Sequence, residues 1–385
     1  MTQLALSNSL SLHHNFFIPN YRSFSSQSQF LLLHPSPFAK PFLRFTHGIS
    51  EPLHPRFIVS SVHQPEPERL PPLNAQTEDL LLKSQQQGSQ LKNRVVFGLG
   101  IGISAGGIIL AGGWVFAAAM AAAVFAGSRE YFELIGSQGI TEGMTPPPLY
   151  VSRVCSVICA LMPLYVMYRG HIDVSVTSAA FVLAITLLVQ RGNARFAQLS
   201  SAIFGLFYCG YLPSFWVKLR CGLAAPALNT RLGTAWPLLL GGQAHWTVGL
   251  VATLISISSI IAADTFAFIG GKAFGRTPLT SISPKKTWEG TIVGFCGCIA
   301  TSLVLSKVFS WPASPVSAIA LGILTFLGSV FGDLTESMIK RDAGVKDSGS
   351  LIPGHGGVLD RADSYVFTGA LAYSFVKTFL PLYGV

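Results

Sequence analysis

The stretch TVGLVATLISISSIIAADTF, residues 247–266, decides the fold class of this chain. It has the length and apolar character of an α-helix that crosses about 30 Å of hydrocarbon, for which roughly 20 residues are needed. Similar apolar stretches recur at 95–111, 113–127, 149–167, 173–190, 198–216, 291–309, 315–332 and 364–382. We therefore predict an all-α, polytopic integral membrane protein with about eight or nine transmembrane helices.

The composition excludes an ordinary water-soluble enzyme. Half of the 385 residues are hydrophobic, only 11% are charged, and the mean hydropathy is +0.50, whereas a soluble domain carries roughly 25% charged residues. The net charge of +9 indicates contact with anionic lipid headgroups or with a polyanionic substrate. No basic stripe is interleaved with aromatic residues, so no nucleic-acid partner is expected. The six cysteines lie in or beside apolar runs without a repeated CxxC frame, which favours neither a zinc site nor a disulfide scaffold.

The N-terminal extension has the composition of an organellar transit peptide. Residues 1–50 contain no Asp or Glu, are rich in Ser, and carry only a few basic residues. The Ser-rich, Arg-poor composition favours a plastid over a mitochondrion, with an ordinary disordered tail as the remaining alternative. We predict a transit peptide over 1–60, a disordered polar linker rich in Pro and Gln over 61–93, and a transmembrane domain over 94–385.

Acidic residues are few and unevenly placed. Between Leu134 and Ala263 only Glu142 and Asp173 are acidic, whereas eight of the 17 acids lie from Asp264 to the end. A carboxylate beside membrane spans is costly and is usually functional. The C-terminal part of the chain is therefore the candidate functional region.

The helix expected at 315–332 is followed by polar residues at helical spacing. If it continues, Asp333, Ser337 and Lys340 lie on one face and present a carboxylate, a hydroxyl and an ammonium together. The Gly-rich segment 349–357 could then bring backbone N–H groups close to a phosphate.

Two further carboxylates, Asp360 and Asp363, stand three residues apart where the last span begins. Together with Asp333 they would meet in a hairpin between two spans, and their hard oxygen ligands favour Mg²⁺ over zinc. The basic residues that would hold phosphates in the same pocket are Lys340, Arg341, Lys346 and Arg361. The competing interpretation is a polar loop with capping acids and interfacial Lys and Arg side chains.

The ordered polar segment Ser337 to Asp363, SMIKRDAGVKDSGSLIPGHGGVLDRAD, resembles the signature of phosphatidate cytidylyltransferases, also called CDP-diacylglycerol synthases. The blocks SPKKTWEG, residues 283–290, and DTFAFIG, residues 264–270, resemble the same family. The resemblance covers about 94–385, and Ala362 is a departure, since the family usually has a bulkier residue there. The transit-like start suggests the plastid branch.

The resemblance implies an all-helical membrane enzyme that condenses CTP with phosphatidate, releasing pyrophosphate and forming CDP-diacylglycerol for phosphatidylglycerol synthesis. It places the catalytic part at 264–385. For cofactors, it implies Mg²⁺, and a second cation such as K⁺ is an option. It also implies that membrane lipid surrounds the enzyme and that a homodimer is an option. The implied location is a plastid membrane, namely the inner envelope, which the chain would cross several times.

The resemblance also suggests a role for each candidate residue. Asp333 and Asp360 would be metal ligands, with Asp363 as a further ligand. The catalytic residues would be Asp333, Asp360, Lys340 and Arg341. In this group, Lys340 and Arg341 would orient the phosphates. The residues expected to bind substrate are Ser337, Lys285, Lys286, Glu289, Asp264, Lys346, Asp347, His355, Gly356, Gly357 and Arg361.

Alternatives remain at three of these positions. Lys285 and Lys286 could only anchor a span end to lipid headgroups, and Asp264 could only make a helix–helix hydrogen bond. His355 either contacts phosphate or makes a hydrogen bond that structures its loop.

Two other classes of protein also remain. A CTP-dependent lipid alcohol kinase, acting on a polyprenol or phytol, would face the same polyanionic substrate. A transporter with intramembrane ionisable residues is the third hypothesis, and no internal repeat is apparent in its favour.

Overall fold

The computed structural model describes residues 98–141, 143–189, 195–227, 245–351 and 356–380. The transit peptide expected at 1–60 and the linker expected at 61–93 lie outside these residues. Within the described ranges the chain is helical, and its loops hold isolated β-bridges such as the one between Pro278 and Thr287.

The structure places the described helices along the chain as follows. After a first helix at Gly98–Ala111, their bounds are α2 Gly113–Ile135, α3 Gln138–Thr141, α4 Leu149–Arg169, α5 Ile172–Leu188, α6 Phe196–Gly205, the π-helix η1 Leu206–Tyr211, α7 Leu212–Gly222, α9 Val248–Phe274, α10 Trp288–Phe309, α11 Pro315–Asp342, α12 Leu359–Ser374 and the π-helix η4 Phe375–Phe379.

The prediction of an all-α polytopic membrane protein is confirmed, because every predicted apolar stretch coincides with a helix over its described residues. In the described part of the chain, five helices are long and apolar enough to cross a membrane: Leu149–Arg169, Phe196–Gly222, Val248–Phe274, Trp288–Phe309 and Pro315–Asp342. The helices Gly98–Ala111 and Ile172–Leu188 are apolar but shorter. The expected number of eight or nine spans exceeds the five that length and composition support within the residues described.

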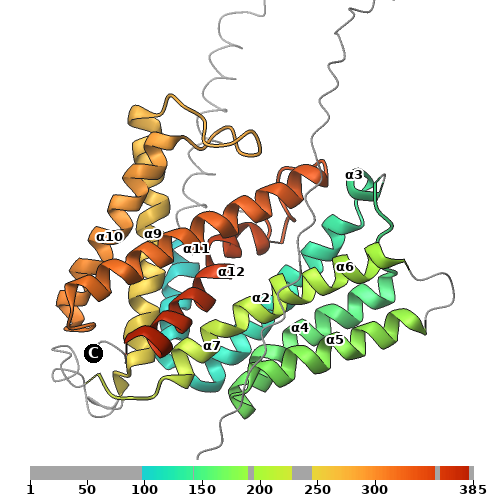
Figure 1. Cartoon of the computed structure of the whole chain (residues 1–385), viewed down its shortest axis with the longest axis horizontal. Helices are drawn as coiled ribbons and strands as arrows, with labels where there is room; N and C mark the ends of the chain where they lie inside the picture. Colours follow the sequence, from blue (N-terminus) through green and yellow to red (C-terminus); the bar gives the residue numbers. More distant parts are fainter. Residues whose placement is uncertain (1–97, 142, 190–194, 228–244, 352–355, 381–385) are drawn as a thin grey trace, which may run out of the picture. The chain divides into compact units, whose positions relative to one another are not determined.

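Small residues let α9 and α10 pack in close contact (Figure 1). A Cβ atom at Gly290 would lie 2.7 Å from the Ala267 carbonyl oxygen, and one at Gly294 would lie 2.8 Å from the Ala263 carbonyl oxygen. Glycines four residues apart are a common way for membrane helices to approach one another. This contact brings Asp264 on α9 beside the start of α10.

Glycines also let α11 and α12 pack closely against each other. A Cβ atom at Gly328 would lie 2.8 Å from Thr368 Oγ1, and one at Gly332 would overlap the carbonyl oxygen of Asp363. The C-terminal end of α11 therefore lies against the N-terminal end of α12. This packing places Asp333 next to the first turns of α12.

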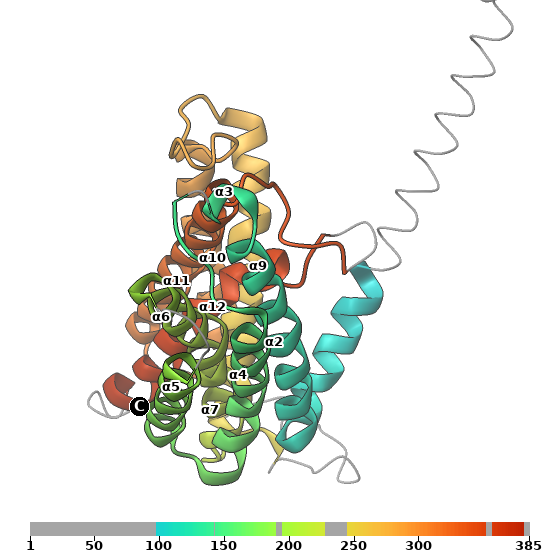
Figure 2. The same ribbon diagram turned by 90° about the vertical axis from the view of Figure 1, so that its right-hand side faces the viewer.

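The remaining helices form a second packed group, in which α2 lies beside α4 (Figure 2). The Tyr131 hydroxyl on α2 donates a 2.9 Å hydrogen bond to the Ser201 carbonyl on α6. The indole N–H of Trp216 on α7 donates a 2.9 Å hydrogen bond to the Tyr365 carbonyl on α12. The Trp216 hydrogen bond attaches α12 to this second group of helices.

We expect Gly332→Ala to destabilise the protein by about 1–3 kcal/mol, because the new methyl group would force α11 away from α12. Gly107→Ala is the matched control, since its Cβ would meet nothing within 4 Å. The measurement is the thermal unfolding midpoint of both variants in the same detergent. Equal midpoints for the two variants would show that the α11–α12 contact is not tight.

Candidate functional site

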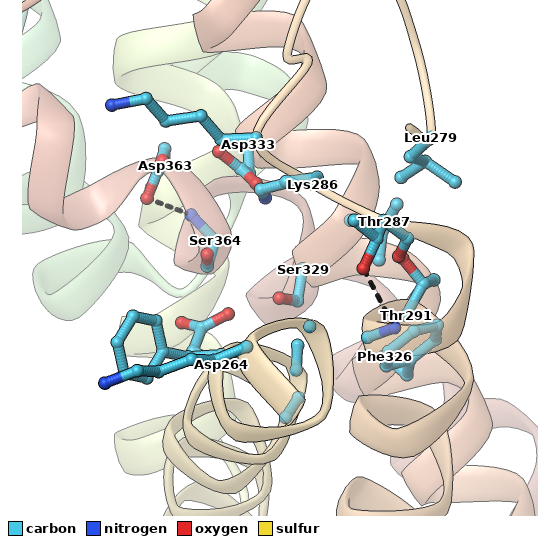
Figure 3. A pocket seen from close by; sticks show the side chains of 18 of the residues that line it. Asp264, Leu279, Lys286, Thr287, Thr291, Phe326, Ser329, Asp333, Asp363 and Ser364 are labelled. Carbon is cyan, nitrogen blue, oxygen red and sulfur yellow. Dashed lines mark hydrogen bonds and ion pairs between the residues drawn. The ribbon is translucent and has the colours of Figure 1, made fainter. Parts of the chain in front are cut away.

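A cavity of about 530 Å³ opens between α9, α10, α11 and α12 (Figure 3). The loop that connects α9 to α10 closes one side of it. Its charged lining consists of four aspartates and three lysines: Asp264, Asp333, Asp360, Asp363, Lys272, Lys285 and Lys286. Apolar side chains, including Phe268, Phe326 and Val330, complete the wall.

Lys286 reaches into the cavity from the loop before α10 and forms an ion pair with Asp333 (Figure 3). Its side chain is 41% exposed, against 15% for Asp333. Partial burial lowers the pKa of the Lys286 ammonium below its ordinary value, and the nearby carboxylates of Asp363 and Asp264 oppose this shift. Because the Lys286 ammonium is partly exposed in the cavity, it is accessible to an anionic substrate.

Glu289 holds the loop that carries the two lysines. Its carboxylate accepts hydrogen bonds from the backbone N–H groups of Arg276 and Thr277, at 3.2 and 3.3 Å, and from the Thr277 hydroxyl at 3.0 Å. Glu289 does not line the cavity. The structure thus places this expected substrate-binding residue under the loop, where it fixes the backbone that precedes Lys285 and Lys286.

Lys340 lies between two carboxylates and is not among the residues that line the cavity. Its ammonium is 2.5 Å from Glu336 Oε2 and donates a 2.7 Å hydrogen bond to Asp360 Oδ1. Glu336 is completely buried. Because α11 continues to Asp342, Glu336 and Lys340 are one turn apart on the same helix.

Asp360 organises the start of α12. Its Oδ2 atom accepts hydrogen bonds from the backbone N–H groups of Ser348 and Gly357, both at 2.8 Å. Gly356 has φ +82°, a conformation that favours glycine. The N–H of Gly357, which was expected to approach a phosphate, donates instead to the carboxylate of Asp360. His355 lies outside the described residues.

Two further carboxylates, those of Glu130 and Glu336, were not predicted from the sequence as site residues. Glu130 lies on α2, is 5% exposed, and accepts hydrogen bonds from Ser348, Val358 and Leu359. The available signal was an acid inside an apolar helical run, which is costly unless it has partners. For Glu336 the signal was the four-residue spacing to Lys340.

Several expected site residues lie outside the cavity lining. Arg341 donates hydrogen bonds to the carbonyl oxygens of Ile282, at 3.3 Å, and Val345, at 3.1 Å, so it joins the α9–α10 loop to the end of α11. Ser337 is buried. Arg341 is exposed, and so are Lys346, Asp347 and Arg361.

The carboxylates of the cavity suit a hard divalent cation in their chemistry. Asp333 contacts Lys286, Asp360 contacts Lys340, and Asp363 accepts a 2.7 Å hydrogen bond from the N–H of Ser364. Among the described residues, no three His, Cys, Asp or Glu side chains lie close enough together to hold a metal ion. A metal at this site would therefore compete with the two lysines for the aspartates.

Comparison with known proteins relates the sequence of this chain to an enzyme family. The sequence profile described as "Cytidylyltransferase family" matches residues 92–379. Phosphatidate cytidylyltransferase 4, chloroplastic, of Arabidopsis thaliana is 76% identical over 301 residues, covering 78% of this chain and 77% of that protein. Phosphatidate cytidylyltransferase 5, chloroplastic, of the same plant is 72% identical over 302 residues, covering 78% and 76%. The phosphatidate cytidylyltransferase of Synechocystis is 41% identical over 290 residues, covering 74% of this chain and 96% of that protein.

We expect Lys340→Met to destabilise the protein by about 3–5 kcal/mol, because it leaves the buried Glu336 carboxylate without its cation. Adding Glu336→Gln to this variant removes the unpaired charge and should restore part of the lost stability. The measurement is again the thermal midpoint in detergent, with the exposed Lys307→Met on α10 as the control. A single Lys340→Met variant as stable as the control would contradict the buried ion pair.

Proposed function

Since this chain belongs to the cytidylyltransferase family, we propose that it is a phosphatidate cytidylyltransferase, which converts CTP and phosphatidate into CDP-diacylglycerol and pyrophosphate. The observation on which this proposal rests is the cavity that gathers four aspartates and three lysines among apolar helices. Such a cavity combines groups that neutralise phosphates with apolar groups that accept a lipid. Both substrates are phosphate esters, and one of them is a lipid.

The reaction forms a bond between an oxygen of the phosphatidate phosphate and the α-phosphorus of CTP. The bond from that phosphorus to the bridging oxygen of the β-phosphate breaks, and pyrophosphate leaves with the electron pair. The second pKa of a phosphate monoester is about 6, so the attacking oxygen is largely ionised at pH 7 and no strong base is needed. The main task of the protein is therefore to hold two polyanions in line and to neutralise their charge.

In our proposal, the lysines of the cavity neutralise part of the negative charge of the substrate phosphates. Lys272, Lys285 and Lys286 line the cavity and would bind phosphate oxygens. In competition with Lys286 and Lys340, the carboxylates of Asp333, Asp360 and Asp363 would hold Mg²⁺, which supplies further neutralisation of the phosphates when it is bound. A second cation such as K⁺ belongs to the same proposal.

The apolar part of the cavity would receive the lipid. Phe268 on α9 is exposed, and Phe326 and Val330 on α11 face the same cavity. An acyl chain could follow these side chains from the surrounding lipid while the phosphate reaches the lysines. This division suits phosphatidate, which has one anionic group and two apolar chains.

A plastid membrane is the location that the chloroplastic relatives and the apolar helices support. Within the plastid we propose the inner envelope. We also propose that the enzyme works as a homodimer, which can be tested by the mass of the purified protein in detergent.

CTP labelled at the γ-phosphate separates this function from that of a lipid alcohol kinase. We expect membranes containing the chain to release the label in pyrophosphate when phosphatidate is supplied, because a cytidylyltransferase breaks the bond after the α-phosphorus. A kinase would leave the label on the lipid, and this result would contradict the proposal. Substrate flux without consumption of CTP would instead indicate a transporter.

Replacing Asp333 tests the catalytic role of the cavity. We expect Asp333→Asn to lower the rate of CDP-diacylglycerol formation roughly 100-fold or more, as when a group that holds a catalytic metal is lost. Chelation of divalent cations should abolish the wild-type activity, and added Mg²⁺ should restore it. Asp342→Asn, at the exposed end of α11, is the control. Full activity of Asp333→Asn would exclude Asp333 from the reaction.

A further inference from the structure

The carboxylate of Glu130 lies under the first turn of α12. Its Oε1 atom accepts a 2.9 Å hydrogen bond from the N–H of Val358, and its Oε2 atom accepts one of 2.8 Å from the N–H of Leu359. The hydroxyl of Ser348 donates a third, at 2.9 Å, to Oε2. These partners are more than 200 residues away in the sequence, so Glu130 connects α2 to the segment that resembles the family signature.

The loop before α12 packs closely against the Glu130 carboxylate at two glycines. A Cβ atom at Gly349 would lie 2.9 Å from Glu130 Oε1, and one at Gly357 would overlap Oε2. Glu130 is 5% exposed and Ser348 is 6% exposed. Two glycines therefore allow the loop to close on a buried anion.

The charge of Glu130 is balanced by the start of α12. In the ranges that the structure describes, the partners shown for its carboxylate are backbone N–H groups and a hydroxyl. N–H groups at a helix N-terminus carry a partial positive charge and bind anions well. The chain thus uses its own carboxylate at a position where other proteins bind a phosphate. Substrate phosphates would accordingly bind on the side of the cavity that carries Lys272, Lys285 and Lys286.

Ser348 links this carboxylate to Asp360. Its hydroxyl donates to Glu130 and accepts a 3.3 Å hydrogen bond from the N–H of Asp360, while its own N–H donates to Asp360 Oδ2. Any movement of Ser348 would therefore move the Asp360 side chain. Asp360 is in turn in contact with Lys340.

We propose that Glu130 is a positioning residue for the nucleotidyl transfer, because it fixes Ser348 and the start of α12 and thereby orients Asp360. This inference rests on the proposed function, since it assigns Asp360 a part in that reaction. Glu130 itself is not among the residues that line the cavity, so we expect it to act through Ser348 and Asp360 and not by touching substrate. Its role is to hold the loop 348–351 and the first turn of α12 in one arrangement.

Hydrogen exchange tests the structural half of this proposal without any measurement of activity. We expect Glu130→Gln to speed exchange of the Val358 and Leu359 amides roughly tenfold or more, because a hydrogen bond to a charged group is stronger than one to a neutral amide. The control is Glu133→Gln, since Glu133 lies on the same helix with a 65% exposed side chain. Unchanged exchange at both amides in Glu130→Gln would overturn the proposal.

Kinetics of the same variants test the functional half. With rates expressed per folded molecule, we expect Glu130→Gln to lower kcat about 10–100-fold, the range found for residues that orient metal-bound groups. KM for CTP should stay within about twofold of wild type, since the lysines that bind phosphates are untouched. Ser348→Ala should produce a similar loss, and the double variant should lose little more than either single variant, because both act through one connection.

Each failure has a distinct meaning. A wild-type protein that exchanges as expected but forms no CDP-diacylglycerol would refute the proposed function. An active wild type with a Glu130→Gln variant of normal kcat would refute the positioning role alone. If Glu130→Gln does not fold, Gly349→Ala crowds the same carboxylate from the loop and keeps its charge. Normal kcat and normal exchange in a folded Gly349→Ala variant would equally overturn the proposal.

Discussion

A carboxylate among apolar helices is stable only where cations or hydrogen-bond donors surround it, and the site depends on this constraint. Glu336 and Asp360 share the ammonium of Lys340. Asp333 is paired with Lys286. Glu130 is surrounded by two backbone N–H groups and a hydroxyl. Because each anion needs its own partners, the ends of α2, α11 and α12 and the loop before α10 can be arranged in few ways.

Close helix packing makes these partnerships possible. The glycines of α10 bring it against α9, and those of α11 bring it against α12. Because these glycines have no side chains, the helices come close together. Asp264, Asp333 and Asp363, from three different helices, therefore line one cavity. The small residues therefore bring the backbones together, and the charged residues gather at the place where the helices meet.

The candidate residues differ in how far their positions could be predicted. Asp333, Asp360, Asp363, Lys285 and Lys286 stand in segments with many polar residues next to apolar ones, and all five line the cavity. Glu289 and Arg341 stand in the same segments, yet they bind loop backbone. A polar side chain beside a span can point toward the cavity or toward its own loop, and spacing along the sequence does not distinguish the two directions.

The sequence by itself determined that the protein is helical, that it lies in a membrane and which segment carries its polar residues, because hydropathy and residue type are local properties. Only the tertiary structure decided which carboxylates share a lysine, and which N–H groups at the start of α12 bind Glu130. The pairings of Lys340 with Asp360 and of Leu359 with Glu130 join residues on different helices. Their geometry depends on how closely helices approach, and this distance is set by the packing of all the helices together.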